Sequence, residues 1–374
     1  MKIIPKTKKD FAWVKYGPKQ IADYTDKTIK KMGLDAEAIK NIDKDKRNFE
    51  NTIFAMDQIG ELEFEDSPVS FLQFVSTDEA VRKASRDFQE KTSKKAIDIS
   101  FDKDLYKAFK EYNPKKEKLS DAEKMLYKWT KIRFENQGFH LPEKTQIELK
   151  NIKKRLSDLG MSFSKNIAED EDFIMCTKEE LAGLPDSFIS NLKIDKKNKK
   201  YIVTTAYPEL QPFLKFADND RKRKELADKS SQKGGKENIK ILKEMLKLRN
   251  KLANLLGYEN FMACTVKDKL AKNPQNVKKF LTSSVSKLKP LLARDYKKLE
   301  NYIDKNYPGK NLNYYSTAYF LSKMKEEMYS FDEKKVKEYF EINNVIDKMF
   351  GIFGHLFSVS FKENKELPKW HSDV

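Results

Sequence analysis

The sequence contains few cysteines and few histidines. Only 2 cysteines and 3 histidines occur among 374 residues. Cys176 and Cys264 lie far apart, which excludes a disulfide framework and fits a reducing compartment. His140, His355 and His371 are isolated, and none has a second histidine four residues away. That spacing is what places two imidazoles on one face of a helix in a zinc peptidase. The residues alone therefore predict no metal ligands in this chain.

Long apolar runs are also missing. The longest nearly uncharged run, residues 349–361, is shorter than the ~20 residues that a membrane-spanning helix needs. The first residues, MKIIPKTKKDF, are basic but carry no apolar segment of the signal-peptide type. We expect a soluble, cytoplasmic protein that does not associate with membranes.

Arginine is scarce although the chain is basic. Lysine and arginine number 75 against 58 acidic residues, which gives a formal net charge of +17. Only nine of these cations are arginines, and nucleic-acid readers favour arginine because its planar group binds bases and phosphates with two hydrogen bonds. We interpret the charge as a lysine-rich solvated surface and expect no specific nucleic-acid partner. The densest basic run, residues 221–224, is interpreted as the exposed side of a helix whose Leu226 and Ala227 face inward.

Most of the chain has helical periodicity, which predicts a mainly α fold. The predicted helices include residues 48–59, 142–168 and 237–256, and another helix after Asn273-Pro274 that Pro290 should kink or interrupt near Lys289. Gly257 is expected to cap its helix in a left-handed conformation. Strands are predicted only at 201–205 and 356–361. We expect a bundle-like helical N-terminal domain over residues 1–195 and a second, incomplete helical domain with a few short strands over residues 196–374.

No residue pattern points to catalysis. Neither cysteine lies in a nucleophile signature, and a free cysteine is often a small buried apolar residue. The acidic run Glu169–Asp172 is interpreted as a solvated loop, His355 as a packed core residue and His140 as part of a turn. We therefore assign no catalytic, cofactor-binding or metal-binding residue in this chain.

Several segments, in order along the chain, resemble motifs of one family. They are residues 49–53, similar to "F-x-N-T"; 138–167, similar to "G-x-x-L-P … L-S-x-L-x-x-x-F-S-x-N"; 170–189, with "L-x-G-L-P"; 201–227, a strand, Tyr-Pro and a charged helix; 238–258, similar to "N-x-x-I-L … L-R-x-x-x-A-x-L-L-G-Y"; 270–281, similar to "M-A-x-x-P-x-x-V-x-x-F-L"; 339–350, with "Y-F … V"; and 367–374, similar to "W-H-P-D-V" but with Ser372 at the proline position. Together they resemble the zinc-dependent oligopeptidases of the thimet oligopeptidase, neurolysin and bacterial oligopeptidase A type.

The resemblance implies a mostly helical metalloendopeptidase that hydrolyses short peptides in a deep channel between two domains. In this family a His-Glu-x-x-His helix and a later glutamate bind zinc, which lowers the pKa of a bound water. The glutamate of the motif accepts the proton of that water as a general base.

The family's zinc motif lies beyond "W-H-P-D-V", and this sequence stops at Val374. His371 and Asp373 match family positions, and we expect structural roles for them. We therefore expect an N-terminal portion that binds no zinc and is inactive alone, with the C-terminal catalytic portion as a possible partner. Apolar faces in 338–361 are expected to form an exposed patch or a partner interface. The alternatives are a non-catalytic helical module that binds peptides or another protein and, ranked last, a basic nucleic-acid-binding protein.

Overall fold

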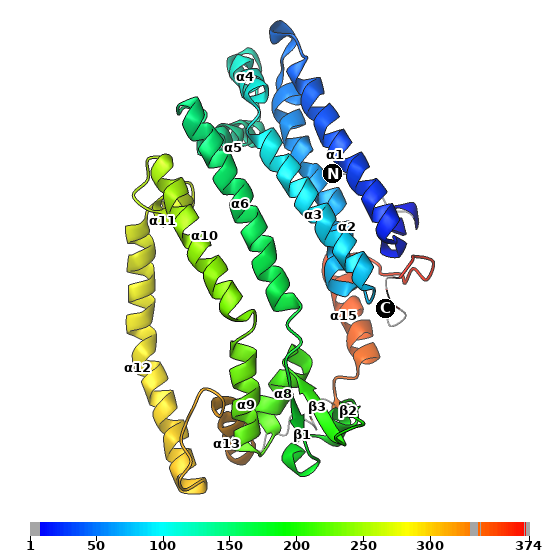
Figure 1. Ribbon diagram of the computed structural model, residues 1–374, viewed down its shortest axis with the longest axis vertical. Coiled ribbons are helices and arrows are strands. Elements are labelled where there is room, and N and C mark those ends of the chain that lie inside the picture. The colour runs from blue at the N-terminus through cyan, green and yellow to red at the C-terminus, as the bar shows by residue number, and fades with distance from the viewer. Residues whose placement is uncertain (1–7, 330–335, 337, 370, 372–374) are drawn as a thin grey trace. The chain divides into compact units, whose positions relative to one another are not determined.

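The computed structural model describes residues 8–329, 336, 338–369 and 371 (Figure 1). Helices predominate, and three short strands form one sheet, so the predicted mainly α fold is confirmed. The described residues divide into two compact units. Unit 1 contains the residues up to Ser162, Ile241–Lys267 and the residues from Glu363; unit 2 contains Phe163–Lys240 and Asp268–Lys362. No helix in the described part of the chain combines the length and the apolar character needed to span a membrane.

Unit 1 is built almost entirely from helices. Its elements are η1 (Lys8–Lys15), α1 (Pro18–Lys40), η2 (Lys44–Lys46), the π-helix η3 (Phe49–Phe54), α2 (Ala55–Val75), α3 (Glu79–Ser100), α4 (Lys103–Glu111), η4 (Pro114–Lys116), α5 (Asp121–Asn136), the first part of α6 (Glu143–Ala168), the second part of α10 (Gly235–Leu255) and α11 (Phe261–Val266). The predicted helices at 48–59 and 142–168 are confirmed.

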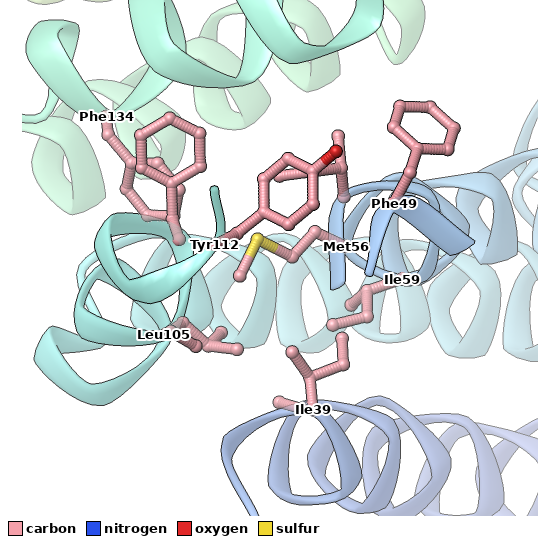
Figure 2. Close-up of a cluster of buried hydrophobic side chains, with 11 residues drawn as sticks. Ile39, Phe49, Met56, Ile59, Leu105, Tyr112 and Phe134 are labelled. Carbon is pink, nitrogen blue, oxygen red and sulfur yellow. The ribbon is translucent and has the colours of Figure 1, made fainter. Parts of the chain in front are cut away.

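The largest core cluster of unit 1 joins α1, η3, α2, α4 and α5. Figure 2 shows Met56 and Ile59 on one side of its interior and Leu105 on the other. Aromatic rings stack within this cluster, for example Tyr106 on Phe139 and Phe109 on Tyr127. Burial of such large apolar side chains contributes about 1.5–3 kcal/mol each and is what orients the short helix α4. The hydrophobic effect therefore accounts for the packing here.

A second cluster packs α6 against α10 inside unit 1. Leu149 and Ile152 of α6 are buried against Leu252 and Leu256. The predicted helix at 237–256 is α10, and its apolar residues recur at helical spacing; those near its C-terminal end are buried, whereas Leu242 and Leu246 are exposed. Gly257, at a φ of +83°, ends α10 in the left-handed conformation that its sequence predicts.

Unit 2 combines the sheet with further helices. Its elements are the end of α6, β1 (Phe173–Cys176), η5 (Glu179–Leu181), α7 (Asp186–Ile189), β2 (Lys193–Asp195), β3 (Lys200–Thr204), α8 (Tyr207–Phe216), α9 (Asp220–Ser231), the start of α10, α12 (Pro274–Asn306), α13 (Thr317–Tyr329) and α15 (Ile342–Phe357). The strands are antiparallel in the order β1-β3-β2, and Ile174 pairs with Val203. The sheet joins residues on both sides of the boundary predicted between residues 195 and 196, and that boundary stays a prediction.

Two expectations about local structure need correction. Pro290 does not interrupt α12, because the carbonyl group that a proline frees, on Ser286, lies in an exposed turn where water can bind it; a kink at Pro290 stays a prediction. Residues 356–361 do not form a strand. α15 runs on to Phe357 and ends at Ser358, which has a φ of 52° and donates its backbone N–H to Gly354. The periodicity of a short apolar run does not distinguish a strand from the end of an apolar helix.

Lys153 of α6 links that helix to the end of α5. Its ammonium group donates a hydrogen bond to the carbonyl of Asn136 at 3.3 Å and to the side chain of Gln137, and it lies 5.3 Å from the ring centroid of Phe101. Burial lowers the pKa of Lys153 to about 8, and the nearby Cys264 offsets this only in part. The amine therefore loses its proton in the folded protein at a lower pH than in the unfolded chain.

We expect Lys153→Met to change the pH dependence of stability. Between pH 8 and 10.5 the unfolded wild-type chain binds more protons at this residue than the folded chain, so stability should rise with pH in this window relative to the variant. The difference in free energy of unfolding between wild type and variant should change by on the order of 2–3 kcal/mol across the window, measured by urea unfolding. The exposed Lys144→Met is the matched control. A parallel pH profile for Lys153→Met and wild type would contradict the assignment.

Candidate functional site

The histidines are the first residues to consider as ligands of a peptidase metal ion. In the part of the chain that the structure describes, no group of three or more His, Cys, Asp and Glu side chains could hold a metal ion. His140, His355 and His371 are all exposed. The prediction that His355 lies in a core is wrong, because the apolar residues of α15 cover most of its circumference and no single face of the helix is buried. Trp370 and residues 372–374 of the last motif lie outside the described residues.

Cys176 lies at the end of β1 in the main core cluster of unit 2. Its side chain is fully buried among Ile174, Val203 and Leu226. Burial raises the pKa of the thiol to about 12, and the positive charge of Lys222 opposes this only partly. The thiolate is the reactive form of cysteine, so Cys176 is chemically inert at neutral pH. Cys264 is half-buried against the core cluster that packs α6 on α10.

The basic run on α9 contains the most buried charge in the described structure. Arg223 is 2% exposed. Its guanidinium donates to the carbonyl of Ala217 and, at 2.5 Å, to the carboxylate of Asp220, and it stacks 4.0 Å from the ring centroid of Tyr319. Hydrogen bonds thus hold the edge of the guanidinium, and the ring of Tyr319 covers its face. Both interactions stabilise a buried arginine.

Tyr319 connects this arginine to the turn before α9. Its hydroxyl donates to Asp218 at 2.9 Å, and burial together with that hydrogen bond raises the pKa of Tyr319. The backbone N–H of Asp218 donates to Ala182 at 2.8 Å, next to Gly183. A Cβ atom on Gly183 would lie 2.3 Å from the carbonyl oxygen of Phe216, and the φ of this glycine is +89°. Only glycine fits where the two backbones approach this closely.

Lys222 is the second buried cation of the run. Its ammonium group donates to the carbonyl of Met175 at 2.7 Å and to Glu225 at 2.9 Å. The prediction that residues 221–224 form an exposed face is therefore correct for Arg221 and Lys224 and wrong for Lys222 and Arg223. Leu226 and Ala227 are buried, as predicted.

The acidic run at the end of α6 is also more structural than predicted. Asp172 pairs with Lys229 at 2.6 Å, which lowers the pKa of its carboxyl group. Asp170 accepts the backbone N–H of Gly234 at 3.0 Å. These carboxylates tie the loop before β1 to α9 and to the start of α10, and do not form a free acidic cluster.

The buried residues Arg223, Lys222 and Tyr319, together with the exposed Asp218, therefore act as a structural centre. Arg223 pairs with Asp220 and Lys222 with Glu225, so both buried cations have a counter-charge at hydrogen-bond distance. This cluster fixes α9 against β1 and α13 by specific geometry. Two residues of this cluster's surroundings, Tyr319 and Gly183, are visible in the sequence. Their distance along the chain hides their role, because only the fold brings them next to residues 217–223.

α12 presents an apolar stripe to solvent. Leu281, Val285, Leu288 and Leu292 recur at helical spacing, and each is more than half exposed. The segment from Pro274 to Arg294 carries five basic residues and no acidic one. α15 is likewise exposed, for example at Ile352, Leu356 and Phe357. Exposed apolar areas of this extent are typical of interaction surfaces.

We expect Arg223→Met to destabilise unit 2 by about 2–4 kcal/mol, because it leaves the carboxylate of Asp220 and the carbonyl of Ala217 without their donor. Thermal unfolding by circular dichroism measures the loss, and amide hydrogen exchange at β1, α9 and α13 localises it. The exposed neighbour Arg221→Met is the control and should stay within about 0.5 kcal/mol of wild type. Equal losses in the two variants would show that the buried pairing is not what stabilises this region.

Comparison with known proteins relates this chain to peptidases. Residues 213–374 match Peptidase family M3. The chain is 33% identical to saccharolysin of Saccharomyces cerevisiae over 82% of its own length and 45% of that protein. It is 31% identical to the thimet-like oligopeptidase of Dictyostelium discoideum over 96% of its own length and 56% of that protein. With oligopeptidase A of Escherichia coli the identity is 28%, over 82% of this chain and 48% of that protein.

The chain thus spans about half the length of these relatives. The match to the family starts inside α8, continues through α9 with its buried arginine and includes α12, α13 and α15. The similarity to the relatives extends across both units. The C-terminal part of the chain, residues 213–374, thus matches peptidase family M3, and both units are similar in sequence to the thimet-like oligopeptidase.

Proposed function

We propose that this chain forms the N-terminal portion of a zinc-dependent oligopeptidase that hydrolyses short peptides. The observation that supports this most directly is the sequence relation to saccharolysin and to two oligopeptidases over 82–96% of the chain. In this proposal the helices of both units are the scaffold of the enzyme, and a cytoplasmic location fits the scarcity of cysteine.

The described residues do not fit a zinc site. A peptidase zinc is held by three protein ligands that converge on one point. The three described histidines, His140, His355 and His371, are all exposed. The thiol of the buried Cys176 stays protonated at neutral pH, whereas a cysteine must be deprotonated to bind zinc. We therefore assign no step of peptide hydrolysis to these residues.

The purified chain alone is expected to cleave no short peptide in a chelator-sensitive way. A quenched-fluorescent peptide of about eight residues reports cleavage, and elemental analysis reports the zinc content, which should be well below one ion per chain. Oligopeptidase A of Escherichia coli, assayed in parallel, controls for the peptide and the buffer. Cleavage that 1,10-phenanthroline abolishes, together with stoichiometric zinc, would overturn this part of the proposal.

The second candidate function is that of an interaction module, and the apolar stripe on α12 favours it. Burying side chains such as Leu281, Val285 and Leu288 would contribute about 25 cal/mol per Å² of apolar surface removed from water. The basic residues beside the stripe favour a partner that carries acidic residues. We propose that this partner is the polypeptide corresponding to the part of the relatives that this chain does not cover.

Leu288→Glu should weaken that association at least tenfold, because it places a charge in the centre of the stripe. The purified chain is titrated with the part of the Dictyostelium relative that lies outside the match, and binding is followed by calorimetry. Leu270→Glu is the matched control, since Leu270 is 98% exposed in the loop before α12 and lies off the stripe. Equal binding by both variants would argue against α12 as the interface.

The nucleic-acid alternative is distinguished by its salt dependence. A phosphate-binding protein loses affinity steeply and linearly on a log–log plot of binding against salt. Lys222 and Arg223, the centre of the densest basic run, are buried in internal pairs, which removes two of the charges that such a surface would use.

A further inference from the structure

Unit 1 contains a cavity of about 260 Å³ within its helices. Its lining comes from five helices and is dominated by buried apolar side chains: Met32, Met56, Ile59, Leu105 and Phe134. Figure 2 shows Met56 and Ile59 reaching toward Leu105, with Phe134 above Leu105.

The polar groups of the lining do not require water. The hydroxyl of Ser100 donates to Ile97 at 2.8 Å, and that of Thr130 donates to Leu126 at 2.9 Å, each within its own helix. A cavity without free polar partners holds water poorly, and an apolar cavity of about 150 Å³ already admits a benzene molecule. The larger cavity here has room for two fused rings.

The chemistry of the lining favours an aromatic ligand without charge. The two methionines offer thioether sulfurs, which make favourable contacts with ring edges, and Phe134 offers a ring for offset or edge-to-face packing. Arg133 is the charged residue of the lining, and it faces Asp57 at 3.5 Å. Because the carboxylate compensates the cation, an anionic ligand gains little there.

The cavity is reachable from solvent. Ile99 and Ser100 are partly exposed, and Arg133 is half exposed, so the lining extends from the buried core to the surface of unit 1. A small ligand can therefore enter without unfolding of the helices. We propose that this cavity binds a small neutral aromatic molecule of one or two fused rings, a binding site separate from any peptide hydrolysis by the protein.

The test uses the full chain labelled with ¹³C at its methionine methyl groups and titrated with indole. The methyl resonances of Met32 and Met56 should shift and saturate with a dissociation constant of roughly 0.1–1 mM, as is usual for ligands of this size in apolar cavities. The chain has 11 methionines, so exposed ones such as Met125 and Met262 serve as internal controls and should not shift. Indole-3-carboxylate should bind at least tenfold more weakly, and equal or tighter binding of this anion would overturn the choice of a neutral ligand.

Ala96→Leu fills the cavity and should weaken indole binding at least tenfold, whereas Ala80→Leu, at an exposed position of the same helix, should leave it within twofold. If Ala96→Leu fails to fold, the wild-type chain still decides the question, because indole at ten times its dissociation constant should raise the thermal midpoint of unit 1. Absence of saturable shifts at Met32 and Met56, or shifts that persist in folded Ala96→Leu, would overturn the proposal. Neither result depends on peptidase activity.

Discussion

α6 and α10 contribute residues to both units, and their side chains contact each other within each of them. In unit 1, Leu149 and Ile152 pack against Leu252 and Leu256, and Arg155 binds Glu244 with two hydrogen bonds of 2.7 and 2.9 Å. In unit 2, the side chain of Asn238 accepts from Asn166 at 2.9 Å and donates to the carbonyl of Phe163 at 3.1 Å. The same two helices are thus joined by apolar packing in one unit and by side-chain amides in the other. A change in the register of either helix would disturb both units.

Unit 2 depends on buried polar geometry as well as on apolar packing. Two guanidinium nitrogens of Arg223 and the hydroxyl of Tyr319 donate to groups of the turn that begins at Ala217, whereas Nε of Arg223 is buried without a hydrogen-bond partner. Removing one partner from such a network leaves a buried group unpaired, which costs more than the lost hydrogen bond itself contributes. The match to the family begins at residue 213, just before this turn, and includes these contacts. The buried cluster has the character of a scaffold, and its pairing leaves no group poised to react.

The exposed stripe on α12 and the exposed α15 have a different physical meaning. α12 carries one apolar stripe on an otherwise polar helix, α15 is apolar over most of its length, and both lie within the part of the chain that matches the family. In unit 1, comparable side chains such as Phe109 and Leu105 are buried by neighbouring helices. The apolar faces of unit 2 have the character of surfaces that become buried when a further polypeptide packs on them. The interaction proposal and the peptidase proposal both name that polypeptide as the part of the relatives that this chain does not cover.

The sequence by itself determined the fold class and most of the long helices, because helical periodicity and glycine caps are local signals. Residues 142–168, 201–205 and Gly257 are examples. It also carried the family relation, which lies in the order of several motifs. The tertiary structure alone decided which members of a pattern are buried: Arg223 inside, His355 outside, and Leu242 and Leu246 exposed on a stripe whose other end is core. Burial depends on partners distant in sequence, such as Tyr319 for Arg223, and a local pattern contains no information about them. The cavity of unit 1 is of the same kind, since it arises from the spacing between five helices.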